Sequence, residues 1–160
     1  MPIPELSERK ILESLDEILN QKNILNSLVP LIDKAFDEFK QNGITSLTKN
    51  IPLEIFKDKL PSAIGLCRLF ILKANTKSKI ERHTNSFQRT FTYSGEGDTK
   101  IFLNNVWESN IRKSTGSKID DRWFSVRENT WHEPIAHSCD WITITFHTAK
   151  ENEIIDEYKK

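Results

Sequence analysis

The sequence lacks the features that define several large classes of protein. It contains two cysteines, Cys67 and Cys139, too few for a disulfide framework, so we expect a reducing, cytoplasmic setting. No apolar run approaches the ~20 residues of a membrane-spanning helix, and the first residues do not resemble a signal peptide. Neither sign of charge is in excess, because 23 Lys and Arg residues balance 23 Asp and Glu residues in the 160-residue chain. We therefore expect no binding to nucleic acid or to a membrane surface, since both require clustered basic residues.

Several common functional motifs are also missing. The sequence has no phosphate-binding G-x-x-x-x-G-K-[ST], no dinucleotide-binding G-x-G-x-x-G and no C-x-x-C. It also has no G-x-S-x-G, the turn that presents the nucleophile of many serine hydrolases. Nucleotide-binding, zinc-finger and serine-hydrolase functions therefore have no support in the sequence.

The first 62 residues have the periodicity of helices. Apolar residues recur every three or four positions from residue 6 to 19 and again from residue 24 to 39. Gly43 is typical of the end of the second helix, and residues 52–60 predict a third, short helix. We expect residues 1–62 to form about three helices that pack on the remainder of the chain.

From residue 66 the spacing changes to that of short strands. All four tryptophans and all four histidines lie in this half of the chain. Many short strands separated by turn residues predict a β-sandwich or barrel, here over residues 63–149, followed by a charged and solvated tail at 150–160. The fold class is thus mainly β with an α-helical amino-terminal part. The predicted strands are 66–74, 86–94, 99–103, 122–126 and 141–147.

A small group of residues in the β half has the chemistry of a metal site. Glu81 and His83 are two residues apart, so on a strand their side chains point to the same face. If two hairpins face each other across a barrel, His132 joins them as a second imidazole. Two histidines and one carboxylate leave open positions on a metal, as in non-haem Fe(II) oxygenases. Gln88 is a further candidate ligand or hydrogen-bond partner.

The spacing of these residues resembles the two sequence motifs of the cupin superfamily. The first cupin motif is G, five residues, H-x-H, three or four residues, E, six residues, G. The corresponding positions here, at the same intervals, are Asn75, Glu81, His83, Gln88 and Gly95. The second motif is G, five residues, P-x-G, two residues, H. The corresponding positions here are Asp121, Arg127, Asn129 and His132.

Three polar residues stand where cupins usually have glycine. Asn75, Asp121 and Asn129 replace glycines of the two motifs, and Asn and Asp tolerate the left-handed conformation best after glycine. The resemblance covers residues 66–148 and implies a double-stranded β-helix, the jelly-roll barrel of cupins.

The resemblance also implies an activity. We expect a mononuclear metal, Fe(II) first, with Zn, Mn and Ni as the other candidates, in a dioxygenase that acts with O₂ on a small polar or anionic molecule. Glu81 replaces the first histidine of H-x-H, and Gln88 replaces the motif glutamate. If the two residues exchange roles, two histidines and one carboxylate still bind the metal. Alternatively, Gln88 is a weak fourth ligand. In a third interpretation, Glu81 turns outward and the site is metal-free.

Two other functions remain open at this point. A metal-free cupin would be an isomerase or epimerase with His83 or His132 as general base. A non-catalytic cupin would bind a small ligand, with its helical half forming the surface of a homodimer; cupins commonly form dimers.

Within the superfamily, the sequence is most similar to the cysteine dioxygenase-like branch. That branch also places helices before the barrel, has Leu-Cys ahead of the first motif, as at Leu66-Cys67, and has an H-T-N-S stretch, as at 83–86. Its iron takes three histidines, the first of which is Glu81 here. An arginine of that branch recognises the substrate carboxylate, and the resemblance offers Arg68 or Arg89 for this role.

Strand alternation places further residues beside the metal. Trp141 and His147 share one face of the strand 141–147. If this face lines the lumen, Trp141 contacts substrate and His147 lies near the metal as a catalytic residue; otherwise His147 is a hydrogen-bonded histidine at a strand end. Gln88 and Arg89 alternate, so Arg89 faces away from the metal when Gln88 faces it, unless a bulge shifts the register.

Overall fold

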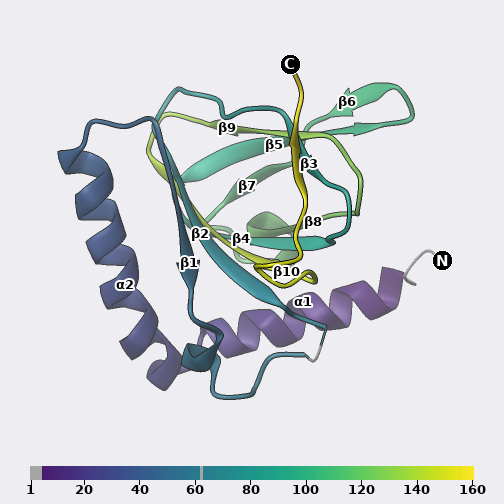
Figure 1. The fold of residues 1–160 in the computed structure, drawn as a ribbon. Helices are drawn as coiled ribbons and strands as arrows, with labels where there is room; N and C mark the ends of the chain where they lie inside the picture. Colours follow the sequence, from purple (N-terminus) through teal and green to yellow (C-terminus); the bar gives the residue numbers. More distant parts are fainter. Residues whose placement is uncertain (1–4, 62) are drawn as a thin grey trace.

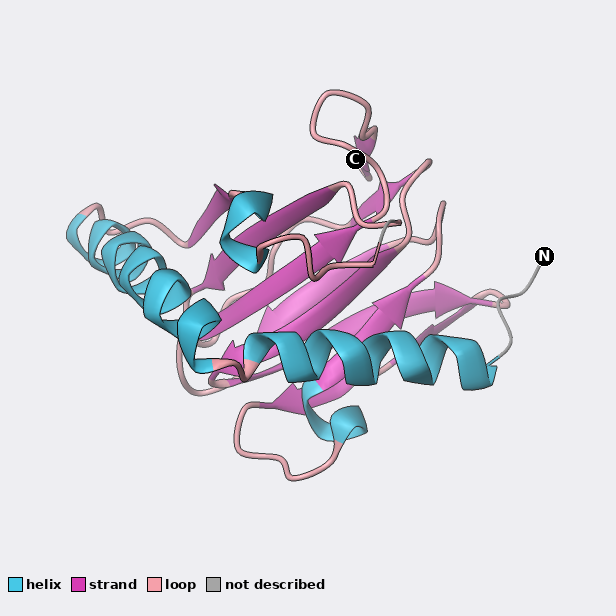
Figure 2. Cartoon of the chain, turned by 90° about the horizontal axis from the view of Figure 1, so that it is seen from below, coloured by secondary structure: helices cyan, strands magenta, loops and turns pink. Residues whose placement is uncertain are grey.

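The computed structural model describes residues 5–61 and 63–160 of the chain. It is mainly β, with two antiparallel sheets that face each other and helices on the outer side of one of them (Figures 1 and 2). This confirms the mainly β class and the helical amino-terminal part. No helix in the described part of the chain is long and apolar enough to cross a membrane.

The five-stranded sheet packs against the helices. Its strands, in spatial order, are β1 (Ser46–Ile51), β2 (Leu66–Leu72), β10 (Trp141–His147), β4 (Gln88–Ser94) and β8 (Trp123–Val126). The outward side chains of β2 and β10, such as Ile71 and Ile144, join the buried faces of the helices in one apolar core. Because side chains alternate along a strand, the other face of this sheet turns toward the second sheet.

The second sheet carries three of the four predicted metal ligands, Glu81, His83 and His132, and the fourth, Gln88, is on β4 of the first sheet. Its path is β11 (Asp156–Tyr158), β3 (Glu81–His83), β9 (His132–Ala136), β5 (Glu96–Leu103) and β6 (Val106–Glu108), and β7 (Ile111–Lys113) also pairs with β5. β3 and β9 lie next to each other, so Glu81 and His132, 51 positions apart in sequence, become neighbours.

The helices differ in part from the expectation. α1 (Glu5–Leu19) and α2 (Lys22–Gln41) correspond to the two apolar stripes. The predicted helix 52–60 is only a 3₁₀ turn, η1 (Leu53–Phe56), because Lys57 and Asp58 adopt positive φ angles that end the helical path. A third α-helix, α3 (Ile119–Arg122), lies instead between β7 and β8.

Two strands lie in segments that the sequence assigned to helices or to a solvated tail. β1 pairs along its whole length with β2, although residues 46–51 lie in the part of the chain expected to be helical. β11 lies within the segment expected to be a solvated tail, and it pairs with β3. Both are edge strands whose polar side chains resemble those of loops, and pairing with a neighbouring strand determines their conformation.

Two carboxylates fix α1 to the five-stranded sheet. The Arg89 Nε and Nη2 atoms donate hydrogen bonds of 2.8 and 2.9 Å to Glu8, and the Ser125 hydroxyl donates another to the same carboxylate. Asp16 accepts hydrogen bonds from the Arg122 guanidinium and from the Trp123 indole N–H. The helix is therefore held by directional polar contacts as well as by its apolar face.

Candidate metal centre

A cavity of about 520 Å³ lies between the inner faces of the two sheets. Most of the residues that line it are polar, and the inward positions of the five-stranded sheet carry hydroxyl side chains such as Thr90, Thr143 and Thr145. The size suits a small-molecule ligand.

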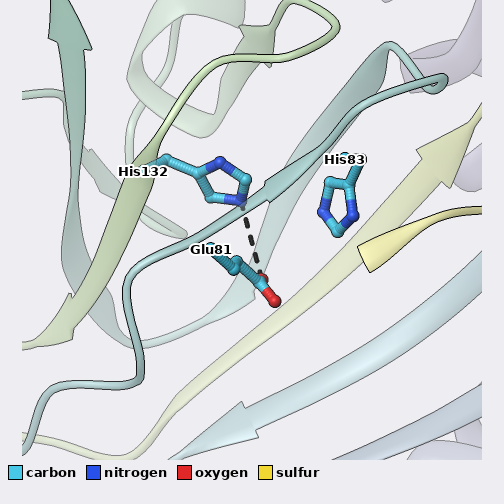
Figure 3. Close-up of side chains that lie close together, drawn as sticks. All are labelled: Glu81, His83 and His132. Carbon is cyan, nitrogen blue, oxygen red and sulfur yellow. Dashed lines mark ion pairs between the residues drawn. The ribbon is translucent and has the colours of Figure 1, made fainter. Parts of the chain in front are cut away.

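Glu81, His83 and His132 meet at one place on the wall of this cavity (Figure 3). One ligand atom from each lies within 4.8 Å of the other two, and His132 Nε2 is 3.6 Å from Glu81 Oε1. Strand geometry explains the cluster: Glu81 and His83 share a face of β3, and Glu81 is directly opposite His132 in the pairing of β3 with β9. His83 and His132 are 5% and 1% exposed, respectively, so both rings are shielded from bulk water, whereas the Glu81 side chain is 26% exposed.

The hydrogen bonds around the two histidines leave one nitrogen of each ring free. His132 Nδ1 is 3.0 Å from the carbonyl oxygen of Thr130, and His83 Nδ1 is 2.7 Å from Asp156 Oδ1. In a neutral imidazole these Nδ1–H groups donate, which leaves both Nε2 atoms unprotonated. Burial lowers the pKa of His83, against the opposing charges of Glu81 and Asp156, and so favours the neutral ring. Two unprotonated imidazole nitrogens and one carboxylate are suitable ligands for a divalent metal ion.

Four further candidates line the same cavity: Arg68, Gln88, Trp141 and His147. Gln88 of β4 is directly opposite His147 of β10. The His147 ring meets the His83 ring edge-on at a centroid distance of 4.8 Å, and its Nδ1 is 3.3 Å from Ser86 Oγ. Burial, followed by the charges of His83, Arg68 and His132, lowers the pKa of His147 well below its usual value. His147 is thus a neutral imidazole beside the candidate ligands.

Arg89 lies outside the cavity. It is 3% exposed, faces the helical layer and binds Glu8, so the structure places it in the attachment of α1. The alternation of Gln88 and Arg89 explains this position, because β4 turns Gln88 to the cavity and has no bulge between the two residues. Of the two arginines offered for substrate binding, only Arg68 reaches the cavity.

Asp156 and Tyr158 also line the cavity, although no motif in the sequence pointed to them. They lie directly opposite His83 and Glu81 in the pairing of β11 with β3, so they share the face of the candidate ligands. The alternation of Asp156, Glu157 and Tyr158 is the only sequence signal for this placement, and three residues are too few to distinguish a strand from a charged tail.

Two of the three glycine replacements have the expected conformation. Asn75 and Asn129 adopt φ angles of 59° and 58°, in the left-handed region where cupin motifs have glycine. The expectation is wrong for Asp121, which lies in α3 and whose carboxylate accepts a hydrogen bond from the Lys118 backbone N–H. The turns around β3 and β9 therefore follow the geometry that the motif intervals predict.

No protein-family model and no curated protein matches the sequence. The fold, in contrast, is similar to several solved structures. Salicylate 1,2-dioxygenase from Pseudoaminobacter salicylatoxidans, in complex with gentisate, matches with a TM-score of 0.61 and 13% identity, over 81% of this chain and 36% of that one. Oxalate oxidase in complex with the substrate analogue glycolate matches with a TM-score of 0.54 and 9% identity, over 69% of this chain and 54% of that one.

The recombinant pro-11S globulin of pumpkin gives a third match, with a TM-score of 0.56 and 12% identity, over 71% of this chain and 28% of that one. This chain thus spans between about a quarter and about half of the length of these three proteins. At 9% to 13% identity, the likeness shows that this chain and these three proteins share a fold. The finer assignment to the cysteine dioxygenase-like branch stays a prediction.

Proposed function

We propose that the chain is a metal-dependent cupin, a mononuclear non-haem Fe(II) dioxygenase that acts on a small anionic molecule in a jelly-roll barrel. The observation that carries this proposal is the convergence of Glu81 with the buried His83 and His132 on the wall of the cavity. In this proposal the three side chains hold the metal, and Gln88 is an additional oxygen donor close by.

The donor set favours a redox-active metal with open coordination positions. Two histidines and one carboxylate are the ligands that non-haem Fe(II) oxygenases use, and bound Fe(II) would supply adjacent positions for O₂ and substrate and transfer electrons between them. Mn, Zn and Ni accept the same donors, so the metal is part of the proposal and of its test.

The charges around the cavity favour an anionic substrate. Arg68, Lys77 and Lys79 line it, and its two carboxylates already have partners: Glu81 lies against His132, and Asp156 lies against both His83 and Arg68. We propose that Arg68 binds a substrate carboxylate, because a guanidinium matches the two oxygens of such a group. The ligands bound in the similar structures, gentisate and glycolate, are also carboxylates.

Two side chains of β10 complete the proposed site. Trp141 forms part of the wall, with its indole N–H directed at Thr92 Oγ1, and offers an apolar surface to the substrate. His147, held neutral by burial, leaves Nε2 to exchange a proton with substrate, since its Nδ1 lies against Ser86.

Metal analysis tests the proposal directly. We expect protein purified without chelator to contain about one equivalent of iron, and the variants His83→Ala, His132→Ala and Glu81→Gln to lose it. His137→Ala is the matched control, because His137 lies outside the cluster with its Nδ1 2.7 Å from Glu96. An equal loss in the control, or turnover by protein free of metal, would contradict the proposal.

Oxygen consumption separates an enzyme from a binding protein. The iron-loaded protein is offered small thiols, diketones and hydroxy acids in an oxygen electrode, and we expect uptake with at least one anionic member of the panel. Arg68→Met is expected to raise KM for that substrate while the iron content is unchanged. Tight binding of a ligand without oxygen uptake would indicate the non-catalytic cupin instead.

A further inference from the structure

The strand that carries two of the three candidate ligands depends on the last strand of the chain. β3 has three residues, and within the described residues it pairs with β9 at a single position, Glu81 with His132. β11 pairs with β3 at all three positions. Two flanking hydrogen bonds extend this contact, from Thr84 N to the Ile155 carbonyl and from Lys159 N to the Ile80 carbonyl. Figure 1 shows β11, in yellow, beside β3.

Asp156 is the residue of β11 that reaches the metal cluster. It is directly opposite His83, and directly opposite residues of antiparallel strands share a face of the sheet. Its Oδ1 lies 2.7 Å from His83 Nδ1, and its Oδ2 lies 3.5 Å from Arg68 Nη1 on β2 of the other sheet. One carboxylate thus connects a candidate metal ligand to the arginine across the cavity.

Glu157 has a different role on the same strand. It points to the opposite face, where the Arg82 guanidinium lies 2.7 Å from its carboxylate. Glu157 therefore attaches β11 to β3 without contacting the cluster. Substitution of Glu157 can thus test the attachment of the strand separately from a direct effect on His83.

We propose that Asp156 is a positioning residue of the metal centre. Its carboxylate accepts the hydrogen bond of His83 Nδ1–H, which fixes the tautomer and the orientation of the ring and makes Nε2 a stronger donor to the metal. The last strand of the chain is thereby part of the metal site. This inference rests on the proposed function, because it requires His83 to be a ligand.

Cobalt binding tests the role of Asp156 without any substrate. Co(II) alone is titrated into the chelator-treated full chain, and its visible absorption bands report both the affinity and the geometry of the site. We expect Asp156→Ala to lower the affinity about 10- to 100-fold, the range for loss of such a partner. Asp156→Asn retains an acceptor oxygen without the charge, so a smaller loss is expected, with shifted absorption bands.

Glu157→Gln is the matched control, since it makes the same change of charge on the neighbouring residue of the strand. We expect its cobalt affinity to stay within twofold of the unmodified protein, with unchanged bands. The thermal midpoint of each metal-free variant is measured alongside. If Asp156→Ala does not fold, the Co(II) titration of Asp156→Asn, whose side chain has nearly the same shape, tests the role of Asp156.

The outcomes separate this inference from the proposed function. Unchanged affinity and bands in Asp156→Asn, with binding lost in His83→Ala and His132→Ala, would overturn the inference and leave the proposed function standing. An equal loss in Glu157→Gln would show that β11 acts only by docking, which also overturns it. If the unmodified protein takes up no Co(II), or if His83→Ala and His132→Ala bind like it, the proposed function fails and the inference with it.

Discussion

Replacing Glu8 by alanine should destabilise the protein strongly without removing the metal site. Glu8 is the only anionic partner of Arg89 among the described residues, and it also accepts the hydrogen bond of Ser125. The change would leave the Arg89 guanidinium, 3% exposed, without a counter-charge and close to the apolar core. Burial of an unpaired charge is among the largest single costs in a folded protein.

The magnitude follows from the burial of the pair. Removing one partner of a buried ion pair costs about 3–5 kcal/mol. The Glu8 side chain is 16% exposed, so water can partly solvate the space it leaves, and we expect the lower end, about 3 kcal/mol. In a domain of this size that lowers the melting temperature by roughly 6–12 °C.

Urea unfolding of three variants measures this cost. Glu13→Ala is the matched control on the same helix, because its ion pair with Arg9 is exposed and should contribute less than about 0.5 kcal/mol. The double variant Glu8→Ala with Arg89→Met removes the stranded charge as well, so it should be more stable than Glu8→Ala alone.

Two results would refute the reasoning. A cost below about 1 kcal/mol for Glu8→Ala would mean that the pair does not hold α1 in place. If Arg89→Met keeps its stability but loses substrate binding, Arg89 is a substrate-binding residue, as the resemblance to the cysteine dioxygenase-like branch implied. We expect the reverse: reduced stability, and an unchanged iron content per folded molecule.

Three other substitutions probe the core, the cavity wall and the histidines. Phe146→Ala should cost about 3–5 kcal/mol in urea unfolding, because its fully buried ring packs edge-on against Phe56 and the sheet cannot close the space. Gly97→Ala should cost about 1–3 kcal/mol and alter the tryptophan fluorescence, because a Cβ there would lie 2.3 Å from the Trp141 ring. The metal-free protein should lose thermal stability as the pH falls below about 6.5, because the unfolded chain protonates His147 there while burial keeps its folded pKa lower. His147→Gln should reduce this pH dependence, and an unchanged slope would contradict the assignment.

The mainly β fold and the meeting of Glu81, His83 and His132 could be anticipated from intervals in the sequence. Strand alternation puts Glu81 and His83 on one face, and the left-handed Asn75 and Asn129 supply the turns that the motif glycines usually make. Strand alternation and turn conformation are short-range features that residue spacing predicts, whereas the approach of His132 to Glu81 was expected from the resemblance to the two cupin motifs.

What could not be anticipated depends on contacts between distant segments. Strand alternation puts Gln88 and Arg89 on opposite faces of β4. Which of these faces is covered by α1, where Glu8 pairs with Arg89, depends on the tertiary packing. Asp156 lies in a run of charged residues that is typical of a solvated tail, and its approach to His83 follows from the pairing of β11 with β3, 73 residues apart in sequence. Edge strands carry little apolar pattern of their own, so their partners decide whether they form.

The pairing of β1 with β2 has a consequence for the evolution of this protein. The segment that holds the two long helices also supplies an edge of the five-stranded sheet, and Thr48 and Asn50 of β1 line the cavity. Loss or exchange of that segment would remove part of the ligand-facing wall and leave the backbone of β2 open to pairing with other chains. The helical segment and the barrel are therefore expected to be inherited together, and substitutions in β1 offer a route to altered ligand preference that leaves the histidines untouched.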